Sequence, residues 1–217
     1  MLSELKSKEF RLSLLIGLFI ASIITSNLIG GKVSEIFLFG IPVVFSVGIV
    51  PFAFTFPITD IVAEVYGKKK AQEVVWIGVS VLIFVLFVTS IAVILPYAER
   101  SWLTAEQYGP VFEQSLRMIF ASIIAFFLSQ THDVWAFEFW KEKTKGRFLW
   151  VRNNASTIIS QFIDSTVFMF IAFYGVSPKY DVAFVFSLII PYYLLKVILA
   201  ILDTPLVYAG VSWLKGK

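Results

Sequence analysis

The sequence predicts an all-α integral membrane protein, with six transmembrane helices in one domain that covers residues 1–217. Three observations support this fold class. Hydrophobic residues make up 58% of the 217-residue chain, more than a soluble domain usually carries. These residues come in long runs and not in the alternating segments of a membrane β-barrel. Lys and Arg gather in alternate connecting segments, as they do in multi-pass membrane proteins.

Each of the six predicted helices is long enough to cross a bilayer, which needs about 20 residues. Their ranges are 12–31, 42–66, 74–98, 113–140, 153–175 and 182–214. The first run is too long for the apolar core of a cleavable signal peptide, so we interpret it as a retained helix. Residues 31–42, bounded by Gly and Pro, are too short to span and predict a small extended or interfacial element on the outer side.

The later connections are short and polar, so they leave no room for a soluble catalytic domain. Residues 99–110 predict a short interfacial helix anchored by Trp102 and Tyr108. Within the last predicted helix, Pro191 and Pro205 predict a kink.

The placement of Lys and Arg predicts the orientation in the membrane. Most of them lie in four segments that six spans would bring to one side: residues 6–11, 68–70, 141–152 and 215–217. Few lie on the other side: Lys32, Arg100, Arg117 and Lys179. Because positive charge favours the cytoplasmic side, we expect both termini in the cytoplasm and the protein in a bacterial inner membrane or archaeal cytoplasmic membrane.

The composition and motifs argue against several classes of function. The chain has no cysteine and one histidine, His132, which excludes thiolate and multi-histidine metal sites. It carries no nucleophile elbow, zinc-protease motif, phosphate-binding loop or dinucleotide fingerprint. We therefore expect no enzyme activity, no metal, no cofactor and no direct nucleic-acid partner.

Some charged side chains must lie inside the membrane. The uncharged runs before His132, Asp164 and Lys196 are each too short to span. Depth counted at about 1.5 Å per residue places four carboxylates from four helices in one layer: Asp60, Asp133, Asp164 and Asp203. On the same count, Lys196 lies farther from the cytoplasm. A buried charge costs about 2.5–3.5 kcal/mol on an insertion scale, so this layer predicts a binding site, with an inert salt bridge as the alternative.

Helical spacing groups the polar residues by face. One stripe in the fifth predicted helix has intervals of three and four residues: Asn154, Thr157, Gln161, Asp164 and Phe168. The fourth predicted helix holds a similar set: Gln130, Asp133 and Phe137. Lys196 and Asp203 share a face of the sixth, and Asn27 lies near the outer end of the first. Lys196 is predicted to pair with either Asp164 or Asp203.

Other positions leave alternatives open. His132 projects to a different side from Asp133 and is either structural or part of a proton relay. Asp60 and Glu64 are further candidates for proton or gating roles. The small residues Gly17, Ala21 and Thr25 permit close helix contact; we expect internal packing, with an external partner as the alternative. Five aromatic residues are candidates for stacking on a cargo: Phe54, Phe56, Trp76, Trp135 and Phe168.

Three blocks of sequence resemble a known family. They are "FPITDIVAEVYGKKKA" (residues 56–71), "DVWAFEFWKEKTKGRFLWVRNNASTIISQFIDSTVF" (residues 133–168) and "LDTPLVY" (residues 202–208). With them the chain resembles the queuosine precursor transporters of the vitamin uptake transporter group. The resemblance implies import of deazaguanine bases, such as the cyano and aminomethyl forms or queuine, for tRNA modification. It also implies a fold like the substrate-binding subunits of energy-coupling-factor transporters, but without their energising partner.

A planar, purine-like cargo suits the buried polar residues. Asp164 or Asp133 is expected to accept the two-donor edge of the base, with Gln161 assisting. Gln161, Asn27 or Lys196 would donate to the carbonyl, and an aromatic ring would cover the base. The alternative is a substrate-binding subunit that needs an energising module. The preferred precursor, the energy coupling and a homo-oligomeric state stay open.

Overall fold

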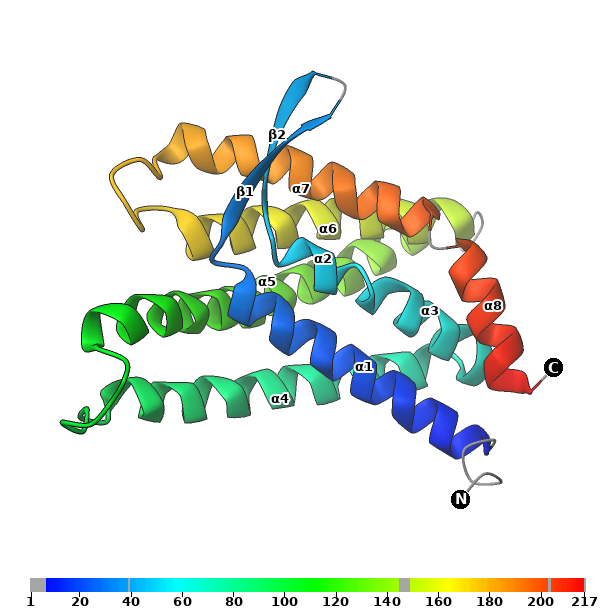
Figure 1. The fold of residues 1–217 in the computed structure, drawn as a ribbon. Helices are drawn as coiled ribbons and strands as arrows, with labels where there is room; N and C mark the ends of the chain where they lie inside the picture. The colour runs from blue at the N-terminus through cyan, green and yellow to red at the C-terminus, as the bar shows by residue number, and fades with distance from the viewer. Residues whose placement is uncertain (1–6, 39, 145–148, 203, 217) are drawn as a thin grey trace.

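The described residues fold mostly into helices, with one β-hairpin among them (Figure 1). The structure is a computed structural model that describes residues 7–38, 40–144, 149–202 and 204–216. The helices are α1 (Lys8–Ile29), α2 (Ile49–Phe52), α3 (Thr55–Tyr66), α4 (Lys68–Ile94), α5 (Ala105–Lys143), α6 (Leu149–Phe173), α7 (Val182–Leu202) and α8 (Thr204–Lys215). The strands are β1 (Val33–Leu38) and β2 (Ile41–Ser46).

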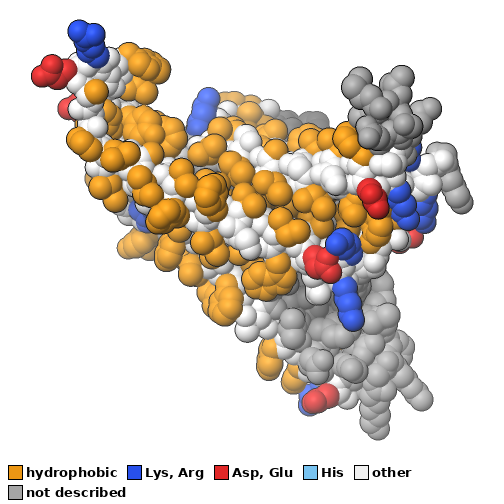
Figure 2. Space-filling model, turned by 90° about the horizontal axis from the view of Figure 1, so that it is seen from below, with side chains coloured by type: hydrophobic (Ala, Val, Ile, Leu, Met, Phe, Trp, Pro, Cys, Tyr) orange, Lys and Arg blue, Asp and Glu red, His pale blue; other side chains and the backbone are white. Residues whose placement is uncertain are grey.

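The described helices have the length and surface of membrane spans. Four stretches are long and apolar enough to cross a membrane: Lys8–Ile29, Ile49–Tyr66, Lys69–Ile94 and Ala105–Ser129. Two shorter apolar stretches, Ile158–Phe173 and Val182–Ile198, belong to α6 and α7. In Figure 2, hydrophobic side chains cover most of the described surface and charged ones gather mainly toward the ends. A surface this apolar suits lipid, so the predicted class of helical membrane protein is confirmed.

The predicted extended element is a hairpin that is longer than expected. β1 and β2 pair antiparallel, from Val33 opposite Ser46 to Leu38 opposite Ile41. Gly40 has a φ of +82°, which glycine adopts without strain. Residues 42–46 were predicted to begin the second helix, and this boundary is corrected here. Their pairing with β1 and the β-branched Val43 and Val44 favour the strand.

The second apolar helix therefore starts at Ile49 and is interrupted between α2 and α3. Pro57 explains the interruption, because it has no backbone N–H to donate to the carbonyl four residues earlier, that of Ala53. Pro57 is tolerated in the first turn of α3, where an N–H would lack a helical partner in any case.

The range predicted as one last helix contains two, α7 and α8. Pro205 lies in the first turn of α8, where proline is tolerated, and it does not continue a helix that precedes it. α8 turns away from α7 and packs against α3 (Figure 1). The contact is close at Gly210, where a Cβ would lie 2.2 Å from Ile61 Cδ1.

Both ends of the described chain lie at the same end of the bundle (Figure 1). The Arg11 guanidinium donates to the backbone carbonyl of Trp213 and lies 5.6 Å from its ring centroid. Lys8 Nζ lies 4.8 Å from the ring centroid of Tyr66, at the end of α3. The two termini and the α3–α4 turn are therefore neighbours.

The bundle has two hydrophobic clusters. The first joins α5, α6 and α7 with Ile49 of α2. The second joins α1, α3, α4 and α8, and α5 contributes Ile119 to it. α5 is also tied to the carboxyl end of α6: Gln114 Nε2 donates to the Ala172 carbonyl at 2.9 Å, and Arg117 donates to two further carbonyls there. These bonds satisfy carbonyls that the helix end leaves without partners.

Candidate functional site

A cavity of about 280 Å³ lies between the two hydrophobic clusters. Its walls come from α1, α2, α3, α4, α5, α6 and α7. The described polar side chains that line it are Ser26, Asn27, Thr55, Thr59, Ser122, Ser129, Gln161 and Asp164. Ligand cavities commonly measure about 300–1,000 Å³ for drug-sized molecules, so this one suits a smaller cargo.

An ion pair between α6 and α7 lies at the cavity wall, where Asp164 lines the cavity and Lys196 lies behind it. Lys196 Nζ lies 2.6 Å from Asp164 Oδ2, and the exposed fractions of their side chains are 2% and 20%. The other carboxylate oxygen, Asp164 Oδ1, is 3.5 Å from the Ser129 hydroxyl. Of the two predicted partners of Lys196, the structure pairs it with Asp164; Asp203 lies outside the described residues. The ion pair offsets much of the cost of two buried charges.

The contact between Lys196 and Asp164 shows that Lys196 does not lie farther along the bundle than Asp164, as the sequence had predicted. Counting residues from the end of a single last helix placed Lys196 beyond Asp164. That count is wrong, because the range contains two helices and α8 does not extend the axis of α7. Lys196 and Asp164 instead lie side by side.

Two aromatic rings flank the ammonium group of Lys196. The centroid of the Tyr192 ring is 4.9 Å from Nζ, and that of Phe52 is 5.1 Å away. Both rings also line the cavity. At these distances each ring face attracts the cation, so the two rings help to keep Lys196 in place.

Part of the polar stripe that the sequence predicted on α6 lines the cavity. Gln161, Asp164 and Phe168, one turn apart on α6, all line it. No hydrogen bond of the Gln161 amide falls among the described residues, which leaves a donor and an acceptor for a ligand. The Phe168 ring stacks on Tyr192, with centroids 5.9 Å apart and planes 16° apart.

Asn27 forms a second polar group on the cavity wall. Ser122 of α5 donates to Asn27 Oδ1 at 2.8 Å, and Asn27 Nδ2 donates to the Ile23 carbonyl at 2.8 Å. The neighbouring Ser26 hydroxyl donates to the carbonyl of Gly48 at 2.7 Å. These bonds join α1 to α5 and to the start of α2, so they fix the shape of this wall.

His132, Asp60 and Glu64 do not line the cavity. His132 Nδ1 lies 3.0 Å from the Ser160 hydroxyl, which links α5 to α6. Asp60 and Glu64 are on the exposed face of α3, whereas Thr55 and Thr59 of the same helix face the cavity. The proton or gating roles of these three residues stay predictions.

The remaining predicted site residues are not placed. The side chains of Gln130, Asp133 and Asn154, and the whole of Asp203, lie outside the described residues. Their predicted contacts with a cargo stay predictions. Among the residues that are described, no group of carboxylates and histidine is arranged to hold a metal ion.

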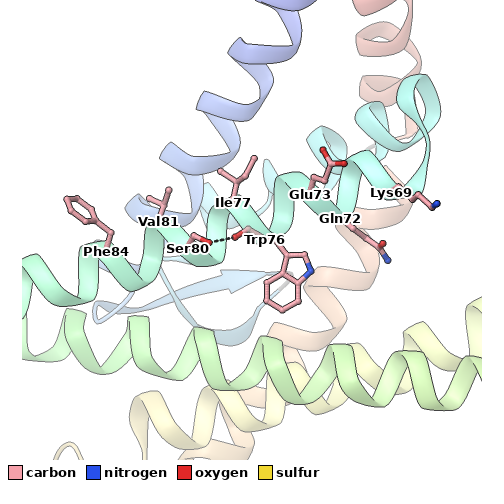
Figure 3. Close-up of a pocket in the computed structure, with 8 residues that line it drawn as sticks. All are labelled: Lys69, Gln72, Glu73, Trp76, Ile77, Ser80, Val81 and Phe84. Atoms are coloured by element: carbon pink, nitrogen blue, oxygen red, sulfur yellow. Dashed lines mark hydrogen bonds between the residues drawn. The ribbon is translucent and has the colours of Figure 1, made fainter.

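The aromatic candidates separate into two groups. Phe56 and Phe168 line the cavity, whereas Phe54, Trp76 and Trp135 are exposed. Trp76 belongs to a shallow groove on the outer surface of α4, where its indole points toward α5 (Figure 3). It meets Phe126 edge-on at 5.6 Å. All eight residues of this groove come from α4 (Figure 3). The cavity is less open and is lined by several helices, so it is the stronger candidate for a ligand site.

The small residues on one face of α1 do not pack as the sequence predicted. Internal packing was expected for Gly17, Ala21 and Thr25, but all three are exposed. A Cβ at Gly17 would meet no described atom within 4 Å. The described helices therefore do not pack against the stripe.

The sequence did not lead us to some residues that line the cavity, although helical spacing places them on the same face as residues already singled out. Ser122 lies seven residues before Ser129 on α5, and Tyr192 lies four residues before Lys196 on α7, so each shares a helical face with its neighbour. Phe52 has no such signal, because it follows a hairpin whose direction the sequence does not predict.

Chemically, the cavity offers reversible binding. It combines a carboxylate oxygen, an amide and hydroxyl groups with aromatic walls, which suits a small flat molecule with several hydrogen-bonding atoms.

Comparisons with known proteins agree with a transport role. The model of a family described as "Putative vitamin uptake transporter" matches residues 46–210. A protein of Bacillus subtilis (strain 168) named "Probable queuosine precursor transporter" is 32% identical over 179 residues, which cover 82% of this chain and 76% of that protein. No solved structure matches. The chain therefore belongs to the vitamin uptake transporter family, as a multi-pass membrane protein related to one named for queuosine precursor transport.

Proposed function

We propose that this protein imports a queuosine precursor, a deazaguanine base such as the cyano or aminomethyl form or queuine, across the cytoplasmic membrane. The observation that carries the proposal is the cavity of about 280 Å³ with Asp164 and Gln161 in its wall. The bacterial relative named for queuosine precursor transport supports the choice of cargo.

The ion pair changes how Asp164 would hold such a base. Lys196 donates to Oδ2 at 2.6 Å, whereas the described partner of Oδ1 is the Ser129 hydroxyl at 3.5 Å, so Oδ1 is the more available acceptor for the two-donor edge. Gln161, one turn earlier on the same helix, would accept the second donor through its amide oxygen. An N–H of Gln161 or Asn27 would donate to the carbonyl, and Phe168 or Phe56 would cover the ring. Lys196 is then a partner of Asp164 and not a donor to the cargo.

We also propose six crossings with both termini in the cytoplasm, as in the substrate-binding subunits of energy-coupling-factor transporters. α1, the α2–α3 pair, α4, α5, α6 and α7 would each cross once. The contact of Arg11 with Trp213 supports an even number of crossings. The basic segments at this end of the bundle support its cytoplasmic location.

Replacement of Asp164 tests the function. Asp164→Asn should lower saturable uptake of labelled cyano-deazaguanine by at least about tenfold, because it removes the charge that accepts the cargo and pairs with Lys196. Uptake would be measured in cells that cannot make queuosine, with the amount of folded protein in the membrane measured alongside.

Asp181→Asn is the matched control. Asp181 lies outside the cavity and accepts from the Phe184 backbone N–H at the start of α7 at 2.8 Å, a role that Asn can also fill. This variant should transport like the unaltered protein. If Asp164→Asn also does so while folded, the assignment of the cavity is wrong.

A second candidate function is favoured by the exposed stripe of Gly17, Ala21 and Thr25. Small residues on a membrane helix let another helix approach closely. On this alternative the chain is a substrate-binding subunit, and a separate energising module docks on α1. The two functions differ in whether this chain moves cargo by itself.

A further inference from the structure

The ammonium group of Lys196 lies behind the cavity wall. Its side chain is 2% exposed and does not line the cavity. Its three neighbours, the carboxylate of Asp164 and the rings of Phe52 and Tyr192, all do line it. A cargo in the cavity would therefore meet these three groups and not the ammonium group itself.

The described wall of the cavity is electrically balanced. Asp164 is the one formally charged residue among the described residues that line it. Its charge is matched by Lys196 at 2.6 Å. The other described lining residues are neutral hydroxyls, amides, aromatic rings and aliphatic chains.

A balanced site treats neutral and cationic cargo differently. Among the described lining residues, a cation that leaves water for this cavity meets no unpaired carboxylate, and to reach Asp164 Oδ2 it has to displace the ammonium already there. A neutral base loses less hydration and still finds Oδ1 as an acceptor. Among deazaguanines, the cyano form is neutral, whereas the primary amine of the aminomethyl form is protonated near pH 7, as the amine of lysine is.

We infer that the cavity selects neutral over cationic cargo, the cyano over the aminomethyl form, and that Lys196 is the positioning residue that sets this preference by neutralising Asp164. The inference rests on the function proposed above and adds to it the charge class of the substrate.

The first measurement uses the unaltered protein. Uptake of labelled cyano-deazaguanine is competed with unlabelled cyano and aminomethyl forms at pH 7, in cells that cannot make either. The cyano form should compete at a concentration at least about tenfold lower, given the cost of an unpaired buried charge. Equal competition, or stronger competition by the aminomethyl form, would overturn this inference and leave the proposed function intact. No saturable uptake of either form would overturn the proposed function itself.

The second measurement assigns the preference to Lys196. Lys196→Met keeps the length and apolar stem but leaves Asp164 unpaired, so the preference for the cyano form should fall at least about tenfold or reverse. Lys196→Arg keeps the charge and should keep the preference. Lys179→Met, in the exposed segment between α6 and α7, is the matched control for loss of a lysine and should also keep it. An unchanged preference in Lys196→Met would overturn the role of Lys196.

If Lys196→Met does not accumulate in the membrane, the measurements on Lys196→Arg and on the unaltered protein still test the inference. Loss of the preference in Lys196→Arg, where the charge remains, would show that charge is not the cause and would overturn the inference. The ratio of the two competitors is the readout throughout, because a general loss of stability lowers uptake of both and leaves their ratio unchanged.

Discussion

Asp164 and Lys196 depend on each other, although they are 32 residues apart in the chain. Removing one member of a buried pair leaves the other charge uncompensated, which typically costs about 3–5 kcal/mol. Both residues therefore contribute to stability as well as to binding. Any loss of transport on replacing one of them has to be compared with the amount of folded protein.

The bond between His132 and Ser160 predicts a structural role for the histidine. His132→Ala should lower the melting temperature in detergent, because it removes the hydrogen bond to Ser160, which is worth about 1 kcal/mol. The concentration of cargo at half-maximal uptake should not change.

A proton relay would give a different result. In that case His132→Ala would alter the dependence of uptake on pH, whereas Ser160→Ala would leave it unchanged. A shifted pH profile in His132→Ala at normal stability would contradict the structural role.

At the level of residues, sequence spacing predicts faces but not partners. The intervals between Gln161, Asp164 and Phe168 follow from helical geometry alone, and all three reach the cavity. The choice of Asp164 as the partner of Lys196 depends on how α6 and α7 are rotated and shifted against each other. Those quantities come from packing over the whole bundle, which spacing within one helix does not contain.

The end of α1, the hairpin and α2 meet through backbone contacts. At Gly48, an added Cβ would lie 2.6 Å from the Ser26 carbonyl oxygen and 2.9 Å from Gly30 Cα. The Ser46 hydroxyl donates to the Gly30 carbonyl at 2.6 Å in the same region. Because the crowding atoms at Gly48 belong to the backbone, a side chain does not fit by a simple change of rotamer.

Gly48→Ala should therefore destabilise the protein by about 1–3 kcal/mol, the usual range for overpacking. The apparent melting temperature in detergent measures the effect. Gly17→Ala is the matched control, since a Cβ there meets no described atom within 4 Å and alanine is the better helix former. The packing argument fails if both variants melt at the same temperature.

Sequence patterns predict the apolar helices well and their interruptions poorly. Runs of apolar residues identify α1 and α4, because a membrane helix must satisfy its own backbone. The strand at residues 42–46 is less apparent, since an apolar run reads the same in a strand and in a helix. Pro205 does indicate a disturbance, but whether proline kinks a helix or begins a new one depends on what the next segment packs against.

For the whole molecule, the two hydrophobic clusters and the cavity between them define two groups of helices. α5 belongs to both, while α6 and α7 lie on one side and α1, α3, α4 and α8 on the other. Movement of the two groups relative to each other would change the cavity.

We therefore expect the purified protein alone to carry labelled cyano-deazaguanine into liposomes, with saturation and with inhibition by excess unlabelled base. Asp164→Asn is the negative control. Binding in detergent without uptake into liposomes would favour the alternative, a subunit that needs an energising module.

Protease treatment of the same liposomes serves as a control for insertion. Tags on the two termini should be cleaved together or protected together in each molecule, because both termini are expected on one side. Cleavage of one tag with protection of the other would contradict the even number of crossings.

The pairing of Lys196 with Asp164 also bears on how the protein is made. A lysine that enters lipid alone meets an insertion penalty of about 2.5–3.5 kcal/mol. α6 leaves the ribosome before α7, and only residues 174–181 separate them. We therefore expect the two helices to leave the translocon as one hairpin with its charges already joined, so that the contact in the mature cavity begins as an aid to biogenesis.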